Sequence, residues 1–240
     1  MTAHSSDFYT QFAPKYAIYA AGRKSYLETI NRLIAEQIID SEQLLDVGAG
    51  DGQRVQTIVQ LLHRPVSVTA VDDSSGMIEI LCKRSGITAV QADIANERLP
   101  LSQSFDTILC LWNVFGHIET AERRLRALNN LAHLLAPTGI LFLDVNNRYN
   151  VAHYGLQSAI RNIAADWLRP SESNGDFPLS IEFGTRRLST SVHIFAPWEI
   201  ERLFSRAGLR ITKRTVVNYA TGQVVPSIFQ GQLMYQLERA

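Results

Sequence analysis

The sequence predicts an α/β protein built on a doubly wound sheet, mostly parallel with an antiparallel closing strand, and with a small insertion cap after the fifth strand. Three observations lead to this fold class. Strand patterns alternate with helical patterns from residue 44 to residue 145, a glycine-rich loop follows the first strand, and aspartates follow the next two. Such alternation implies right-handed βαβ units with helices on both faces of the sheet. With 240 residues and 46% hydrophobic side chains, the chain can bury one sizeable core, so residues 1–240 are expected to form a single domain.

The first 40 residues are expected to form a lid and a helix beside the core. Residues 7–22 are rich in tyrosine and phenylalanine and follow neither a helical nor a strand period. Apolar residues between Lys24 and Ile39 lie near helical spacing, which predicts a helix there.

Residues 41–147 form the predicted cofactor-binding core, in which short apolar or β-branched runs alternate with helical patterns. The expected strands cover residues 44–47, 66–71, 88–92, 105–111 and 140–145. The expected helices cover residues 55–62, 76–83 and 121–135. Pro137 and Gly139 are expected to separate the last of these helices from the fifth strand.

The pattern changes after residue 147. Residues 148–196 are expected to form an insertion that caps the substrate, with a helix over 149–167 and two short strands within 177–195. Residues 197–240 are expected to close the fold with one helix, over 197–207, and two strands, over 210–217 and 228–237. The large aromatic residues of the insertion either line an apolar pocket or form its own core, and the second interpretation is favoured because a small extension must bury something. These residues are Trp167, Phe177, Phe183 and Phe195.

The glycine-rich loop is the strongest chemical signal in the chain. Residues 44–52 read as a strand that ends in Asp-x-Gly-x-Gly-x-Gly and opens a helix, and glycines let the backbone come close to a ligand. A dinucleotide fingerprint would place its third glycine at Gln53, and Asp46 and Asp51 would repel a diphosphate. A ligand with sulfonium and ammonium groups is instead attracted by two carboxylates, which points to S-adenosylmethionine. Taken alone, the loop fits a simple tight turn equally well.

Acidic residues at two further strand ends support this interpretation. Asp72 ends the second strand, about twenty residues after the loop, where a carboxylate accepts hydrogen bonds from ribose hydroxyls. Asp93 follows the third strand and is placed to accept from an adenine amino group, with Ile94 and Met77 packed on the ring faces. Each acid by itself is also compatible with a helix cap, but three at successive strand ends favour one shared site.

Four consecutive segments resemble the motifs of class I S-adenosylmethionine-dependent methyltransferases. They are Leu44–Gly52, Val71–Met77, Ala92–Ile94 and Ser104–Ile108, and the similarity covers residues 40–147. Residues 134–139 also resemble the family's Leu-x-Pro-Gly-Gly turn, from which Thr138 departs. The resemblance implies a Rossmann-like version of the predicted sheet and S-adenosylmethionine as the cofactor.

The resemblance also implies roles for individual residues. Gly48 and Gly50 are expected to contact the methionyl portion, and residues 111–113 to form the floor beneath the sulfonium. Tyr16 is a candidate for an aromatic lid, and Arg23 for a partner of the cofactor carboxylate. The alternative is that Tyr16 is a packing residue and Arg23 a surface charge. The full set of expected cofactor-binding residues is Tyr16, Arg23, Asp46, Gly48, Ala49, Gly50, Asp72, Asp73, Met77, Asp93, Ile94, Leu111, Trp112 and Asn113.

A methyl group on a sulfonium is already activated, so the protein mainly has to align a nucleophile and exclude water. His117, six residues beyond Leu111, is the candidate general base; the alternative, a structural histidine that caps the next helix, is slightly favoured. The six histidines show no paired ligand spacing, so no metal is expected. Cys82 and Cys110 are expected to be small core residues.

Composition narrows the class of partner without naming the acceptor. No apolar run approaches the ~18 residues of a membrane span, and the N-terminus lacks the layout of a signal peptide, so a cytoplasmic protein with no membrane partner is expected. Net charge is zero, although the second half of the chain is more basic than the first. The leading hypothesis is methyl transfer to oxygen or nitrogen of a small molecule. The alternatives are methylation of RNA such as tRNA, and a non-catalytic cofactor-binding subunit with a protein partner; the oligomeric state stays open.

Overall fold

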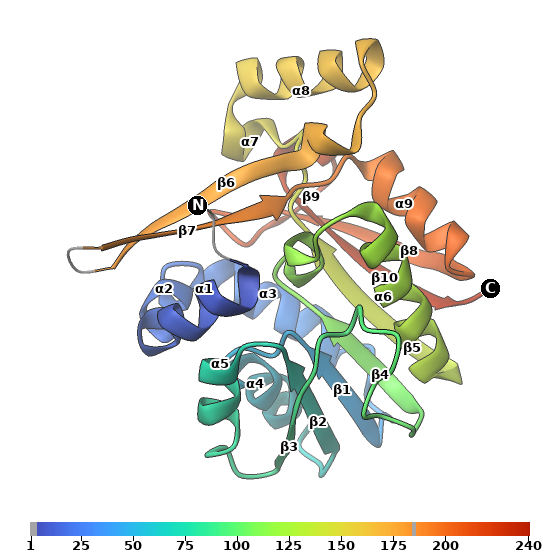
Figure 1. Ribbon diagram of the computed structural model, residues 1–240. Helices are drawn as coiled ribbons and strands as arrows, with labels where there is room; N and C mark the ends of the chain where they lie inside the picture. Colours follow the sequence, from blue (N-terminus) through green and yellow to red (C-terminus); the bar gives the residue numbers. More distant parts are fainter. Residues whose placement is uncertain (1–3, 184–185) are drawn as a thin grey trace.

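The computed structural model of the chain describes residues 4–183 and 186–240 (Figure 1). Its centre is an eight-stranded sheet with the strand order β3-β2-β1-β4-β5-β10-β8-β9. The first five strands run parallel, and they are β1 (Gln43–Val47), β2 (Ser67–Asp72), β3 (Ile87–Gln91), β4 (Phe105–Cys110) and β5 (Leu135–Val145). The order reverses between β1 and β4, and ligands of such sheets bind at the carboxyl ends of the strands at that point.

Antiparallel strands complete the sheet, which confirms the predicted fold class. β10 (Gln232–Arg239) lies between β5 and β8 (Leu209–Val217) and is antiparallel to both, and β9 (Val224–Val225) pairs with β8 at the edge. The last strand begins later than predicted, because residues Ile228–Gln230 form a 3-10 turn. β5 begins earlier than predicted, since Leu135 already pairs with Phe105, and its register against β4 then shifts.

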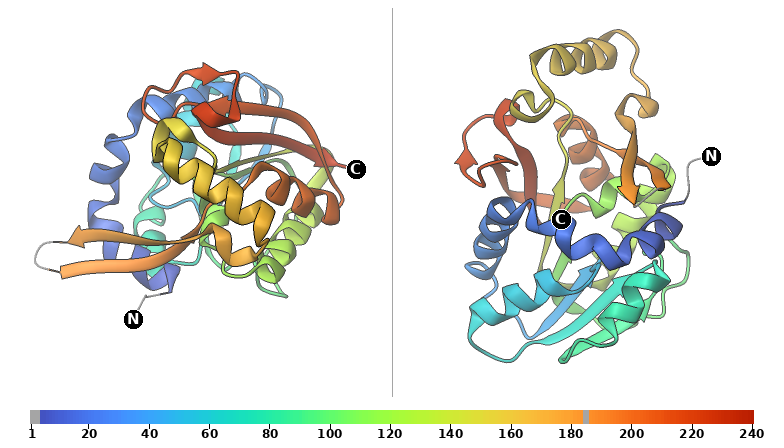
Figure 2. Two further views of the ribbon diagram at one scale, coloured as in Figure 1. Left: turned by 90° about the horizontal axis from the view of Figure 1, so that it is seen from above. Right: turned by 90° about the vertical axis from the view of Figure 1, so that its left-hand side faces the viewer.

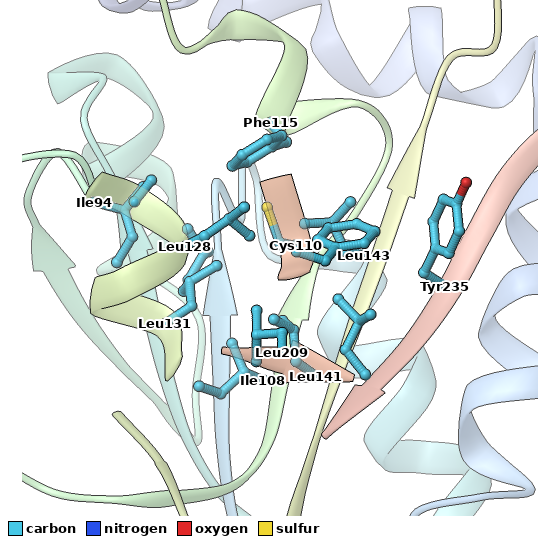
Figure 3. Close-up of a cluster of buried hydrophobic side chains, with 14 of the residues drawn as sticks. Ile94, Ile108, Cys110, Phe115, Leu128, Leu131, Leu141, Leu143, Leu209 and Tyr235 are labelled. Carbon is cyan, nitrogen blue, oxygen red and sulfur yellow. The ribbon is translucent and has the colours of Figure 1, made fainter. Parts of the chain in front are cut away.

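Helices cover both faces of the sheet because side chains of each strand alternate between two cores. Leu45 belongs to a core with α6 and α9, which Figure 3 shows from the side of α6. Leu44, the preceding residue, packs in a second core with α3 and α4. The bounds of the covering helices are α3 (Lys24–Ala35), α4 (Gln53–Leu62), α5 (Ser75–Leu81), α6 (Ala121–Leu134) and α9 (Pro197–Arg206). Cys110 is buried in the first core, whereas Cys82 is exposed, so the expectation of a core position is wrong for Cys82.

The N-terminal segment, residues 4–22, forms short helices that the sequence did not predict. They are α1 (Ser5–Phe12), a 3-10 turn (Ala13–Lys15) and α2 (Tyr16–Ala21). In the right-hand view of Figure 2 these helices cross the molecule between the parallel core and the insertion. α1 packs on α5 at Gly76, where an added Cβ would lie 2.7 Å from the carbonyl oxygen of Thr10. Thr10 and Ser74 also join their hydroxyl groups at 3.0 Å.

The insertion consists of helices and a hairpin. α7 (Val151–Tyr154) and α8 (Leu156–Leu168) replace the single predicted helix, because Gly155 adopts a φ of 82° between them. The two predicted strands are confirmed as the hairpin of β6 (Asp176–Phe183) and β7 (Arg186–His193), which pair only with each other in the described residues. Of the aromatic residues, Trp167 is 84% exposed and Phe195 is buried in the main core, so they do not form a separate core. Phe177 is half-buried, and the Phe183 side chain lies outside the described residues.

A buried ionic network fastens the insertion to α9. Arg148, only 1% exposed, donates from Nε and Nη2 to both carboxylate oxygens of Asp166, at 2.9 Å each, and from Nη1 to Glu199 at 2.6 Å. The ring nitrogens of His193 lie 2.7 Å from Asp176 and 2.9 Å from Glu199. Among the described helices, none has the length and apolarity to cross a membrane.

Candidate active site

A cavity opens at the carboxyl ends of β1, β2 and β4, with the N-terminal segment and the hairpin of the insertion on its other sides. Most of the residues predicted for the site line it, and these are Tyr16, Gly48, Gly50, Asp72, Asp73, Met77, Asp93, Ile94, Leu111, Trp112, Asn113 and His117. Three others do not line it. Asp46 and Ala49 are buried, and the Arg23 guanidinium lies over the ring of Tyr219, 4.7 Å from its centre.

The glycine loop leaves no room for side chains. Gly48 and Gly50 have φ values of 65° and 58°, which other residues adopt at a cost. A Cβ on Gly48 would lie 2.4 Å from Val114, and a Cβ on Gly50 would lie 3.1 Å from the Tyr16 ring. The two glycines therefore let the loop pack closely against Val114 and Tyr16, and both of them also line the cavity.

Asp72 holds the loop and still faces the cavity. Its carboxylate accepts hydrogen bonds from the backbone N–H of Gly50 at 2.9 Å and of Ser74 at 3.0 Å. Burial raises its pKa to about 6, although both hydrogen bonds act in the opposite direction. Each carboxylate oxygen has a second lone-pair direction, so the group can still accept from a diol. Asp73 lies beside it, and burial raises the pKa of that group as well.

Asp93 is paired with an arginine that the sequence did not single out. Its Oδ1 accepts from the N–H of Ala95 at 2.8 Å, and its Oδ2 accepts from the Arg123 guanidinium. Arg123 lies in the first turn of α6 and lines the cavity. Nothing in the local sequence links residues thirty positions apart, so only the fold reveals the pair. Met77 and Ile94, 1% and 5% exposed, supply apolar walls on this side.

The charge of a second arginine, Arg54, partly offsets the effect of burial on Asp46 in β1. Asp46 is 5% exposed, and burial raises its pKa to about 7, while the charge of Arg54 acts to lower it. Arg54 lies on the first turn of α4 and donates from Nε to Asn31 at 3.1 Å. Its two Nη atoms are buried and have no hydrogen-bond partner among the described residues. Arg54 does not line the cavity, and its charge also acts to lower the pKa of a second buried carboxylate, that of Asp144.

Aromatic residues also line the cavity. The Trp112 ring stacks on Tyr19 and meets Tyr16 edge-on, each with ring centroids 5.7 Å apart. Its Nε1–H donates to the Tyr219 hydroxyl at 3.0 Å. The insertion adds two apolar residues, Leu179 and Val192, so the hairpin reaches the cavity although the predicted aromatic residues do not.

His117 lies at the end of a 3-10 turn (Val114–His117) on the same wall. Its Nε2 is 3.1 Å from the Tyr9 hydroxyl, and its Nδ1 is buried without a hydrogen-bond partner among the described residues. Burial lowers its pKa to about 4, so the ring is neutral near pH 7. The next helix is capped by the Thr120 side chain, which accepts from Arg123 N–H at 3.3 Å. The alternative role of His117 as that helix cap is therefore wrong.

Comparison with known proteins connects this site to one class of enzyme. A family model described as a methyltransferase domain matches residues 44–139. Glycine N-methyltransferase of Rattus norvegicus is 30% identical over 138 residues, which are 50% of this chain and 46% of that protein. The tRNA N(3)-cytidine methyltransferase METTL2 of Gallus gallus is 28% identical over 181 residues (71% and 43%). Ubiquinone biosynthesis O-methyltransferase of Methylococcus capsulatus is 27% identical over 150 residues (58% and 62%). The chain thus spans about half the length of these relatives.

Solved structures share the fold over nearly the whole chain. An S-adenosylmethionine-dependent methyltransferase from Clostridium acetobutylicum superposes with a TM-score of 0.63 at 16% identity, covering 96% of this chain and 97% of that one. The amino pentose methyltransferase CalS10 from Micromonospora echinaspora, with S-adenosylmethionine bound, has a TM-score of 0.61 at 18% identity and covers 94% and 96%. At such identities the likeness concerns the fold.

Proposed function

We propose that the chain, whose residues 44–139 match a methyltransferase domain, is a class I S-adenosylmethionine-dependent enzyme that transfers a methyl group to an oxygen or nitrogen atom of a small molecule. One observation carries the proposal: Gly48 and Gly50, the strand-end acids Asp72 and Asp93, and a buried neutral histidine, His117, line the same cavity. The N-terminal segment would act as its lid and residues 148–196 as the cap over the acceptor.

The residues present fit the cofactor by charge and by space. S-adenosylmethionine, when bound, supplies a methyl group activated by a positively charged sulfur. Gly48 and Gly50, which line the cavity, would hold the methionyl portion, whereas Arg23, the predicted partner of its carboxylate, lies over Tyr219. Asp72 would hold the ribose. The remaining predicted contacts keep their proposed roles: Asp93, Ile94 and Met77 at the adenine, and residues 111–113 beneath the sulfur.

His117 would accept the proton of the attacking group. The neutral imidazole can donate Nε2–H to the Tyr9 hydroxyl, which leaves the lone pair on the unpartnered Nδ1. Burial keeps Tyr9 a neutral phenol by raising its pKa, so it does not compete for that proton as a base. The remaining protein groups exclude water and align the nucleophile.

A small acceptor is supported by the lining near His117. Leu179, Val192 and Asn146 offer apolar surface and one amide, and the chain as a whole has no net charge. Relatives named for glycine, for an amino pentose and for ubiquinone biosynthesis are consistent with such acceptors. The second candidate is tRNA, which the likeness to METTL2 and the more basic second half of the chain favour.

The test combines binding with turnover. Calorimetry should show binding of S-adenosylmethionine and S-adenosylhomocysteine but not of NAD, and release of S-adenosylhomocysteine should then be followed with glycine, an amino sugar, a phenol and bulk tRNA as acceptors. His117→Ala should lower turnover by about 10² to 10⁴-fold with cofactor affinity unchanged. Binding of NAD alone would refute the proposal.

Two outcomes would redirect the acceptor. Turnover of tRNA, with tRNA affinity that falls steeply as salt rises, would favour the RNA candidate. Tight cofactor binding without turnover of any acceptor, together with a second chain that co-purifies, would indicate a non-catalytic subunit.

A further inference from the structure

The turn that follows β4 has a strained backbone. Trp112 and Asn113 are consecutive, neither is glycine, and their φ values are 63° and 58°. Residues with a Cβ adopt this left-handed region rarely and persist there only when their surroundings hold them. Both residues line the cavity at the end of the strand, in the position assigned to the floor beneath the sulfur.

A buried carboxylate on the neighbouring strand holds this turn. Asp144 of β5 is 1% exposed, and its Oδ1 accepts hydrogen bonds from the backbone N–H groups of both Trp112 and Asn113, the latter at 3.2 Å. Its Oδ2 accepts from the hydroxyl of Tyr26 on α3 at 2.8 Å. Asp144 does not line the cavity, so it reaches the site only through the backbone that it holds.

The side chains of the held turn reach the two segments that cover the cavity. The Trp112 ring stacks on Tyr19 of the N-terminal segment. The Asn113 amide accepts from Asn146 N–H at 2.8 Å and donates to the carbonyl oxygen of His193 in the insertion at 3.3 Å. A change in the backbone of the turn would therefore move the floor, the N-terminal segment and the insertion together.

We propose that Asp144 is a positioning residue, whose carboxylate keeps the Trp112–Asn113 turn left-handed and so sets the floor of the methyl-transfer site. The inference rests on the proposed function for its catalytic consequence, but the hold on the turn is independent of it. A role as a base is ruled out by geometry, since three donors occupy the carboxylate and none of it faces the cavity. Its effect must pass through the backbone of the turn.

The experiment reports on Trp112 directly. In a background with Trp167→Phe and Trp198→Phe, Trp112 is the remaining tryptophan of the three in the chain. Its emission and its quenching by acrylamide are measured in Asp144→Ala and Asp144→Asn, together with S-adenosylmethionine affinity and turnover of the acceptor panel. The matched control is Asp106→Ala, because Asp106 also accepts from two consecutive backbone N–H groups, those of Glu42 and Gln43, at 2.9 Å each.

Asp144→Ala should shift Trp112 emission to the red, increase its quenching and lower turnover by about tenfold to hundredfold, since misplacement by about 1 Å can cost that much. Affinity for S-adenosylmethionine should change by no more than about threefold, because the glycine loop, Asp72 and Asp93 lie at the ends of other strands and Asp144 does not hold them. Asp144→Asn should restore most of the emission and turnover, since its amide oxygen still accepts from the turn. Asp106→Ala should match the parent protein in every readout.

Several results would overturn the inference. These are unchanged Trp112 emission in Asp144→Ala, equal impairment in Asp144→Asn, and an equal shift in Asp106→Ala. If Asp144→Ala does not fold, Tyr26→Phe removes the support of the carboxylate from α3 and should give a smaller red shift; no shift there would also overturn it. Failure of the parent protein to bind S-adenosylmethionine would count against the proposed function alone, because the emission of Trp112 is read without cofactor.

Discussion

Replacing Asp72 with alanine should lower cofactor affinity more clearly than it lowers stability, because two opposing effects act on the free energy of unfolding. Loss of the carboxylate strands the buried N–H groups of Gly50 and Ser74, at about 1 to 3 kcal/mol each. It also removes a charge whose burial raises the pKa from 3.8 to about 6, which relieves about 3 kcal/mol near pH 7. The unfolding free energy should therefore fall by no more than about 3 kcal/mol. Binding has no such compensation, so affinity should fall by about 1 to 3 kcal/mol, or roughly 5-fold to 150-fold.

Calorimetric titration with S-adenosylmethionine at pH 7.5, beside urea unfolding of the same variant, measures both quantities. Asp106→Ala is the control, since it removes a carboxylate that accepts from two backbone N–H groups at the beginning of β1, outside the cavity. The affinity of the parent protein should also fall between pH 7 and pH 5 as Asp72 gains a proton, and Asp72→Ala should lack that component. An affinity within twofold of the parent protein, or an equal loss in the control, would refute the assignment of Asp72 to the ribose.

Three further perturbations test the fold around the site. Burial raises the pKa of Asp46 from 3.8 to about 7, so its contribution to stability is complete below pH 3.8 and is lost as the pH rises through 7. Asp46→Asn should therefore raise the unfolding free energy at pH 8 by on the order of 3 kcal/mol and leave it unchanged at pH 3.5. An equal gain at both pH values would contradict this. Gly76→Ala places a Cβ 2.7 Å from the Thr10 carbonyl oxygen, so it should loosen the packing of the N-terminal segment on α5. Proteolysis of that segment and release of the cofactor should both become roughly tenfold faster. An unchanged cleavage rate would show that α1 does not depend on this contact. Arg148→Leu leaves Asp166 and Glu199 without their buried partner and should lower the unfolding free energy by about 3 to 5 kcal/mol in urea, whereas a loss below about 1 kcal/mol would mean that the network contributes little.

The parts of the fold that the sequence predicted are those set by short-range pattern. β1 and β2 are short apolar runs, and each is followed by a turn whose residues favour a particular backbone conformation. Gly48 and Gly50 allow positive φ after β1, and Ser74 caps the helix that follows β2. Because parallel strands end at one edge, the sequence predicts a shared cavity for the strand-end acids, which Asp72 and Asp93 line and which the buried Asp46 does not. The order and type of elements between residues 43 and 145 follow from these local rules.

Residues that depend on contacts between distant segments could not be predicted. The pairing of Asp93 with Arg123, the burial of Arg54 and the hold of Asp144 on residues 112–113 each join different elements. The N-terminal helices were missed for a related reason: Phe8 and Phe12 are buried, whereas the tyrosines of the segment line the cavity and no residue of α2 is buried. The sequence therefore does not show the period of a helix that packs on a flat core. The positive φ angles of two consecutive non-glycine residues, Trp112 and Asn113, are a local sign of a functional turn. The backbone of the structure shows these angles, and the sequence does not.

The beginning of α4 decides between a cationic nucleoside and a dinucleotide. A diphosphate would bind to free N–H groups at the start of the helix after the glycine loop. Here the Asp51 carboxylate already accepts from the N–H of Gln53 at 3.1 Å, and the Tyr16 ring covers Gly50. The guanidinium of Arg84, 3.7 Å from Asp51, offsets part of that charge without freeing the N–H. A phosphate about 4 Å from such a carboxylate would meet a repulsion of up to about 4 kcal/mol at an effective dielectric of 20, whereas a sulfonium or ammonium group would gain from the same field. The Asp51 carboxylate thus disfavours a diphosphate and favours a positively charged cofactor.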